Sequence, residues 1–254
     1  MNYKEAAKML VEKGFYHSNL KAWPREHISR AMLQFMDRPM TERLAFLQKE
    51  MNSVFDGYSY QGQADSLNQG AEDMVHTFVI SEFTEKEVFP SEWQVYLSNE
   101  FKSISDQLFQ IENELIKQLN LTIKRVDLGH MVSCNFYPAQ GEISNKLRLS
   151  EHPDVSVFTI FPFGIDDQLE YEENGEWKPL LASNNLVIFS GYLLETLSNG
   201  KVKALNHRVK NIEEACQERL SFAFFTIPNN EAKLNVNGNT INATNYFESY
   251  LALF

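Results

Sequence analysis

The sequence predicts an α+β fold with a helical first half and a second half built mainly from β-strands. Residues 91–119 carry apolar side chains at three- and four-residue intervals, which predicts one long amphipathic helix. From residue 125 to about 227, short runs rich in β-branched and aromatic residues alternate with turn signals, and no helical pattern separates the runs. Such a succession of strands predicts a sandwich or a barrel. We expect the long helix to back that β core.

Local periodicity and breaker residues predict shorter elements in the first half. These are helices over residues 3–13 and 24–36, a further short helix that Thr41 can open, and strands over residues 15–17 and 75–80. The run 52–70 is polar and rich in Gly, Ser and Gln, which predicts a long loop. A loop of that length serves either as a plain connector or as a lid over a site.

The second half predicts a series of short strands. The candidates span residues 128–137, 154–161, 168–172, 176–181, 185–189, 201–209 and 219–227. Asn174-Gly175 and Asn199-Gly200 are the clearest turn signals between them. In the tail, Asn237-Gly238-Asn239 predicts a turn, and residues 246–251 predict a short helix packed on the outside.

Length and composition predict a single domain over residues 1–254. A chain that is 43% hydrophobic and 13% aromatic can bury a full core. Within the domain we expect a mostly helical N-terminal part over 1–124, a β core over 125–228 and a C-terminal tail over 229–254.

Charge and cysteine content exclude several classes of protein. The formal net charge of −11 argues against a nucleic-acid surface, which needs basic patches. Two cysteines are too few for a disulfide framework. The N-terminal residues lack the apolar core of a signal peptide, and no apolar run reaches membrane-spanning length. We therefore expect a cytoplasmic protein that binds neither nucleic acid nor a membrane; the sequence does not predict its oligomeric state.

One pair of residues has the spacing of metal ligands. His152 and Asp154 lie two positions apart in a segment that reads as a strand, and residues i and i+2 of a strand project from the same face. His207, at the end of another predicted strand, is the best candidate for a third ligand. Two histidines and one carboxylate that leave positions open are typical of non-haem Fe(II) oxygenases.

A second pair suits a carboxylate. Arg219 and Ser221 lie on one face of a predicted strand, among apolar neighbours. A buried guanidinium needs a partner, it matches a carboxylate bidentately, and a nearby hydroxyl can donate another hydrogen bond.

The order of these motifs resembles the Fe(II)/2-oxoglutarate-dependent dioxygenases, and within them the isopenicillin N synthase-like branch. The resemblance spans nearly the whole chain. It rests on His152-Pro153-Asp154, on His207-Arg208-Val209 and on Arg219-Leu220-Ser221, and also on Asn135-Phe136-Tyr137-Pro138, Asn174-Gly175-Glu176-Trp177 and Leu197-Ser198-Asn199-Gly200.

The resemblance implies a double-stranded β-helix, which is a jelly roll, with N-terminal helices and a long backing helix. It implies Fe(II) on His152, Asp154 and His207, and 2-oxoglutarate as cosubstrate on Arg219 and Ser221. It adds Tyr137 to the same carboxylate and places Asn135 near the metal-bound end. The implied reaction consumes O2, hydroxylates a small organic molecule, releases succinate and CO2, and can need ascorbate for activity.

Two other functions remain open from the sequence. An iron oxidase of the same fold would use O2 without 2-oxoglutarate, and a non-catalytic module would bind metal or 2-oxoglutarate without turnover. At the level of single residues, His152 and Asp154 can form a buried structural pair, and Arg219 can pair with an internal acid. We expect Arg148 to be a solvated surface charge and Arg208 to form an exposed ion pair.

Overall fold

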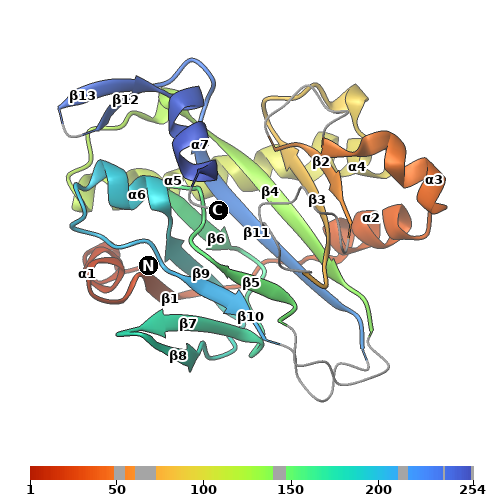
Figure 1. Ribbon diagram of the computed structural model, residues 1–254, viewed down its shortest axis with the longest axis horizontal. Helices are drawn as coiled ribbons and strands as arrows, with labels where there is room; N and C mark the ends of the chain where they lie inside the picture. Colours follow the sequence, from red (N-terminus) through yellow and green to blue (C-terminus); the bar gives the residue numbers. More distant parts are fainter. Residues whose placement is uncertain (49–54, 61–72, 140–146, 211–216, 237, 253–254) are drawn as a thin grey trace.

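The computed structural model describes residues 1–254 except 49–54, 61–72, 140–146, 211–216, 237 and 253–254. Two antiparallel sheets face each other and form a jelly-roll core (Figure 1). The larger sheet has the order β1-β9-β6-β11-β4-β3-β2. Its strands are β1 (Phe15–Lys21), β2 (Gly57–Ser59), β3 (His76–Ser81), β4 (Leu128–Tyr137), β6 (Phe158–Phe161), β9 (Asn185–Ser190) and β11 (Arg219–Pro228).

The smaller sheet has the order β5-β10-β7-β8. Its strands are β5 (Leu149–His152), β7 (Leu169–Glu173), β8 (Glu176–Pro179) and β10 (His207–Val209). Asn174 and Gly175 join β7 to β8, and both have positive φ, 56° and 81°. A two-residue loop with that backbone matches the twist of the flanking strands, so the turn signal in the sequence is confirmed. A separate hairpin pairs β12 (Lys233–Val236) with β13 (Asn239–Asn242).

Helices cover the outer face of the larger sheet, and α5 runs behind it in Figure 1. The α-helices are α1 (Tyr3–Lys13), α2 (Glu26–Met36), α3 (Met40–Arg43), α4 (Ser91–Tyr96), α5 (Lys102–Gln118), α6 (Tyr192–Leu197) and α7 (Ala243–Leu251). Short helical turns lie at Leu44–Phe46, Lys86–Val88 and Arg125–Asp127, and a π-helical turn lies at Leu97–Phe101.

The predicted long helix over 91–119 is confirmed with one interruption, the π turn between α4 and α5. Tyr96 and Phe101 are both buried and lie five positions apart. Five residues of a regular α-helix turn through well over one turn, which would rotate Phe101 away from the apolar stripe. The wider π turn brings both rings back to the same side, and their centroids are 6.3 Å apart.

Two apolar cores result from this layering. One lies between the larger sheet and the helices and includes Trp93, Leu108 and Phe224. The other is smaller, lies between the two sheets, and includes Tyr137, Phe161 and Leu169. The alternation of side chains along β4 and β11 decides which residues reach which core.

Several predicted bounds are wrong. The strand expected over 154–161 begins only at Phe158, and the strand expected over 201–209 is limited to β10. Strand β2 lies inside the run predicted as a loop over 52–70, where it pairs with β3; the lid prediction falls largely on residues outside the described ranges. Helix α6 was not expected. The tail helix is confirmed as α7, but Tyr246, Phe247 and Tyr250 are buried, so it is part of the core.

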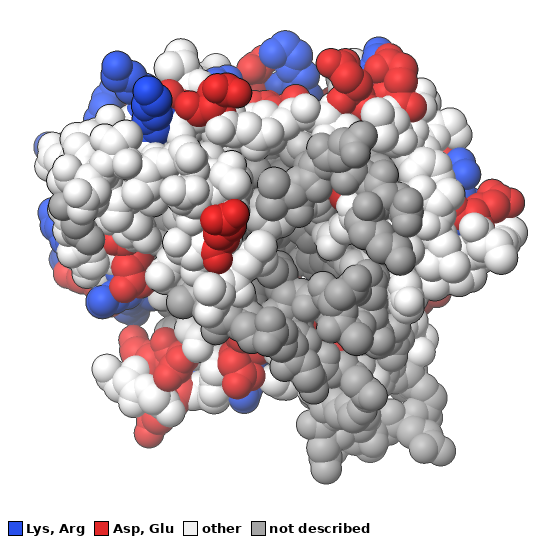
Figure 2. Space-filling view, turned by 45° about the horizontal axis from the view of Figure 1, so that its top comes forward, with Lys and Arg blue, Asp and Glu red and all other residues white. Residues whose placement is uncertain are grey.

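Within the described ranges, no helix is both long and apolar enough to cross a membrane. On the face shown in Figure 2, the acidic and basic side chains that are drawn in colour are interspersed with uncharged residues.

Candidate metal and cosubstrate site

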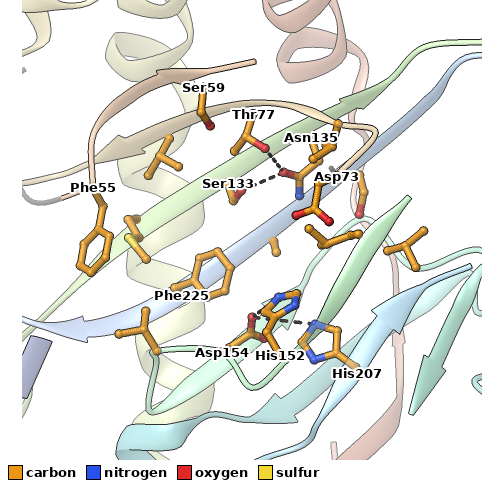
Figure 3. Close-up of a pocket in the computed structure, with 18 of the residues that line it drawn as sticks. Phe55, Ser59, Asp73, Thr77, Ser133, Asn135, His152, Asp154, His207 and Phe225 are labelled. Atoms are coloured by element: carbon orange, nitrogen blue, oxygen red, sulfur yellow. Dashed lines mark hydrogen bonds and ion pairs between the residues drawn. The ribbon is translucent and has the colours of Figure 1, made fainter. Parts of the chain in front are cut away.

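The structure brings His152, Asp154 and His207 together at one end of the space between the sheets (Figure 3). We call these three residues the metal triad. Potential ligand atoms of all three lie within 4.8 Å of one another. The Nε2 atoms of His152 and His207 are 3.7 Å and 3.8 Å from Oδ1 of Asp154.

The reason for this convergence differs from the one expected. His152 ends β5 and pairs directly with His207, the first residue of β10. Directly opposed residues of antiparallel strands bring their side chains close together. Asp154 lies beyond the end of β5, so strand alternation does not align it with His152. The loop after β5 turns the carboxylate back toward both rings.

The hydrogen bonds of the two imidazoles leave one ring nitrogen of each histidine able to bind a cation. Nδ1 of His152 lies 2.7 Å from the carbonyl oxygen of Ser150, and Nδ1 of His207 lies 3.1 Å from that of Leu205. Because a carbonyl only accepts, each Nδ1 carries the proton, and each Nε2 presents a lone pair. Burial is the largest cause of the lowered pKa of His207, which favours the neutral ring that a metal ligand requires.

Asp154 supplies an unsatisfied oxygen. Its Oδ2 atom is buried and has no hydrogen-bond partner among the described residues. An unpaired buried carboxylate oxygen is costly unless a cation or donor meets it. With two imidazole lone pairs beside it, this donor set fits a divalent transition metal such as Fe(II).

The backbone around Asp154 is fixed by the last helix. The hydroxyl of Tyr250 donates to the carbonyl of Pro153 at 2.8 Å, and the hydroxyl of Tyr246 donates to that of Val155 at 2.5 Å. The backbone N–H of Tyr192 donates to the carbonyl of Asp154 at 2.7 Å. The carboxylate therefore sits on a loop held from both sides, which nothing in the sequence pattern indicated.

A cavity of about 180 Å³ extends from the metal triad between the sheets. One of its walls consists of alternate residues of β4 and β11, which pair with each other in register. The pairs are Tyr137 with Arg219, Asn135 with Ser221, Ser133 with Ala223, and Met131 with Phe225. All four residues predicted to bind the cosubstrate thus line the same cavity as the metal triad.

Arg219 is buried and already has a carboxylate partner. Its Nε atom donates to Oδ2 of Asp166 at 2.5 Å, and Nη2 donates to Oδ1 at 3.0 Å. The guanidinium lies over the ring of Tyr137, with 4.6 Å from Cζ to the ring centroid. Its Nη1 atom has no partner among the described residues. The sequence left open whether Arg219 pairs with an internal acid, and in the structure it does, with Asp166.

The other two predicted residues differ in their surroundings. Ser221 lines the cavity one residue pair along from Arg219. The side-chain oxygen of Asn135 accepts from Thr77 at 2.9 Å and from Ser133 at 3.0 Å (Figure 3). Because both bonds fix the oxygen, the NH2 group of Asn135 remains as the donor at this wall.

Two expectations about basic residues have different outcomes. Arg148 is fully buried, so the predicted solvated charge is wrong; it donates to Gln168 and to the carbonyl of Pro138. Arg208 forms the expected ion pair, at 2.8 Å from Glu170, and stays partly exposed. The sequence could not separate the two cases, because both arginines lie in strand-like runs.

A sequence model of the 2OG-Fe(II) oxygenase superfamily matches residues 128–228, a range that contains the metal triad and Arg219. The β core of the chain is therefore similar in sequence to this family. The match ends at the last residue of β11, and it begins at the first residue of β4.

Curated plant enzymes of this type are similar to the chain. It is 26% identical over 224 residues to feruloyl CoA ortho-hydroxylase 2 of Arabidopsis thaliana, which covers 82% of this chain and 60% of the relative. It is 37% identical over 112 residues to 1-aminocyclopropane-1-carboxylate oxidase 1 of the same plant, which covers 42% and 35%. The chain thus spans less than two thirds of the length of these relatives.

Solved structures of low sequence identity share the fold. A full-length Neurospora crassa protein in complex with α-ketoglutarate has a TM-score of 0.77 at 20% identity, over 99% of this chain and 90% of that one. A putative 2OG-Fe(II) oxygenase family protein from Caulobacter crescentus has a TM-score of 0.76 at 16% identity, over 99% and 95%. The jelly-roll expectation is confirmed by these matches.

Proposed function

We propose that this protein is an Fe(II)- and 2-oxoglutarate-dependent oxygenase that hydroxylates a small organic molecule and releases succinate and CO2. The observation that supports it most is the arrangement of one cavity: three metal-ligand side chains at one end, and a buried arginine with a tyrosine and a serine on its wall. The similarity of residues 128–228 to the 2OG-Fe(II) oxygenase superfamily supports the same cofactor and cosubstrate.

In this proposal each residue has a defined task. His152, Asp154 and His207 would hold the iron through Nε2, a carboxylate oxygen and Nε2, a three-ligand set that is typical of iron sites with open positions. Arg219, Ser221 and Tyr137 hold the far carboxylate of 2-oxoglutarate, and Asn135 donates from the adjoining wall. The bound iron would supply the oxidising chemistry, while the protein supplies ligand geometry and substrate placement.

Apolar side chains keep water from this space. Phe161, Leu169 and Phe225 line the cavity, and the first two belong to the core between the sheets. Exclusion of water protects a reactive centre from side reactions. A reducing compartment such as the cytoplasm suits Fe(II), and a small-molecule partner suits a cavity enclosed between two sheets.

One observation favours the oxidase alternative. Asp166 already occupies two donors of Arg219, so the arginine does not strictly need an external carboxylate. The two functions differ in whether succinate forms. With Fe(II), ascorbate, O2 and a panel of small organic molecules, we expect substrate-dependent release of succinate from 2-oxoglutarate; product without succinate would support the oxidase instead.

Metal and cosubstrate binding test the site without turnover. We expect Mn(II), as an unreactive substitute, to bind the protein in calorimetry, and 2-oxoglutarate to bind the Mn(II)-loaded protein. Asp154→Ala should lower Mn(II) affinity by about 100-fold or more, since a ligand contributes more than its supporting residues. His27→Ala, which changes an exposed histidine on α2, is the control. Equal Mn(II) affinity of both variants would contradict the assignment.

A further inference from the structure

A carboxylate that takes no part in the proposed metal and cosubstrate binding points into the cavity. Asp73 precedes β3 and is 8% exposed, and its side chain lies among the cavity residues in Figure 3. Its Oδ1 atom accepts from the backbone N–H of Ser150 at 2.9 Å and from the Ser150 hydroxyl at 2.8 Å. Its Oδ2 atom has no hydrogen bond or ion pair to the described residues.

The position of Asp73 is coupled to the metal triad through one residue. The carbonyl of Ser150 accepts from Nδ1 of His152, while the N–H and hydroxyl of the same serine hold Asp73. The backbone N–H of Met74 also donates to the carbonyl of Arg148 at 3.0 Å. Oδ2 of Asp73 is therefore an acceptor fixed relative to the metal ligands, as a substrate-orienting group must be.

The charge on Asp73 is not neutralised by the protein around it. Among the described cavity residues, Arg219 is the only lysine or arginine, and Asp166 is paired with it. In the loaded site, Asp154 and 2-oxoglutarate would carry three negative charges against the two positive charges of Fe(II), so the space stays negative even before Asp73 is counted. A buried carboxylate without a cation is unfavourable, so the missing partner is a positively charged group. A substrate with its own carboxylate would meet repulsion there.

The cavity wall that leads away from Asp73 along β3, β4 and β11 has many apolar residues. Val75, Val79, Met131 and Phe225 line the cavity near the polar group formed by Thr77, Ser133 and Asn135. This combination matches a ligand with one charged end and a compact hydrocarbon or aromatic body.

We propose that the substrate of this protein is a small amine, with its protonated nitrogen bound to Oδ2 of Asp73 and its apolar body against Val75, Met131 and Phe225. The proposal rests on the proposed function for the reaction that follows. It adds a substrate class and a residue that selects it. Asp73 orients the amine and takes no part in metal binding.

The test compares amines with matched acids on the same scaffolds. The probes are 2-phenylethylamine with phenylacetate, tryptamine with indole-3-acetate, and cyclohexylmethylamine with cyclohexanecarboxylate. Relaxation enhancement of the probe protons by bound Mn(II), with 2-oxoglutarate present, reports binding next to the metal. We expect the amines to bind about 10-fold or more tightly than the acids, because a desolvated charge pair is lost in the acids. Acids that bind as tightly as amines, or amines that do not bind at all, would overturn the proposal.

A variant then assigns the preference to Asp73. Asp73→Asn keeps an oxygen for Ser150 and removes the charge, so it should lower amine affinity about 10-fold and leave 2-oxoglutarate affinity undiminished. Glu151→Gln removes an exposed carboxylate from β5, the strand that carries Ser150, and is the matched control. Unchanged amine affinity in folded Asp73→Asn refutes the role of Asp73. If 2-oxoglutarate fails to bind the Mn(II) protein, the proposed function fails instead, and the comparison with Mn(II) alone still decides the amine preference.

Discussion

Two polar clusters lie against opposite faces of strands β4 and β11, and they differ in how completely their polar groups are hydrogen-bonded. On the helix side lies the closed cluster, which we define as Ser105, Glu112, His130 and Thr226. His130 lies 2.6 Å from Ser105 and 2.9 Å from Glu112, and Thr226 donates to Glu112 at 2.5 Å. Every member is at most 2% exposed.

The cavity side of the same strands has unsatisfied groups. Oδ2 of Asp154 and Nη1 of Arg219 are buried without partners among the described residues, whereas no atom of the closed cluster is in that state. Contact between a serine, a histidine and a glutamate that are distant in sequence can suggest catalysis. However, no buried polar side-chain atom of the closed cluster lacks a partner, and none of its residues lines the cavity beside the metal triad. Unsatisfied buried groups beside a cavity are the better sign of a ligand.

The largest effect that we expect concerns the closed cluster. Glu112→Ala leaves His130 and Thr226 without their partner in a fully buried place, so it should lower the free energy of unfolding by about 3 kcal/mol. Urea denaturation measures this change. Mn(II) and 2-oxoglutarate affinities should stay as in the unchanged protein, because the cluster faces away from the cavity. A marked loss of Mn(II) affinity in the folded variant would contradict the view that the two faces of the sheet act independently.

On the cavity side, we expect Arg219→Ala to change the affinity for a ligand. Removal of the guanidinium should weaken 2-oxoglutarate binding by about 100-fold, while Mn(II) affinity is largely kept, since a charge-assisted bidentate contact is lost. Calorimetry on the Mn(II)-loaded protein measures both. Arg208→Ala, which removes an arginine paired with Glu170 outside the cavity, is the control. The assignment of Arg219 is refuted by equal 2-oxoglutarate affinity in the two variants.

A smaller effect is expected from Asp166→Asn. Asp166 uses two of the five N–H donors of Arg219 and places a negative charge beside the guanidinium, so it competes electrostatically with the cosubstrate carboxylate. Loss of its charge should tighten 2-oxoglutarate binding about fivefold, or roughly 1 kcal/mol. The same calorimetric titration detects the change. Weaker binding in Asp166→Asn would mean that Asp166 orients Arg219 for the cosubstrate and does not compete with it.

Much of the fold followed from periodicity in the sequence. Helices α1 and α2, the long backing helix, and strands β4 and β11 lie close to their predicted bounds, because each has a long and regular apolar pattern. Strand β2 was not predicted, because Gly57–Ser59 lies in a polar run and becomes a strand only by pairing with β3. Residues 201–206 have a strand-like composition but turn before β10, after the loop that starts at Asn199 and Gly200, which both have positive φ.

The candidate site was predicted only where a motif is short and local. His152, Asp154 and the Arg219-to-Ser221 pair stand out by spacing. His207 was a candidate because it ends a predicted strand, and the resemblance added Tyr137 and Asn135. Asp73 and Asp166 could not be found in that way. Each is one of two adjacent acids in the sequence, without a spacing motif around it. Each acquires its role from a partner far away in sequence, Ser150 for Asp73 and Arg219 for Asp166.

The hydroxyls of Tyr246 and Tyr250 make helix α7 a support for the loop that carries Asp154. They hold the peptide carbonyls on both sides of Asp154, so a protease that cut ahead of Ala243 would release that carboxylate from its support. Retention of iron would then become a readout of an intact C-terminal segment, and affinity tags for this protein are safer at the opposite end of the chain.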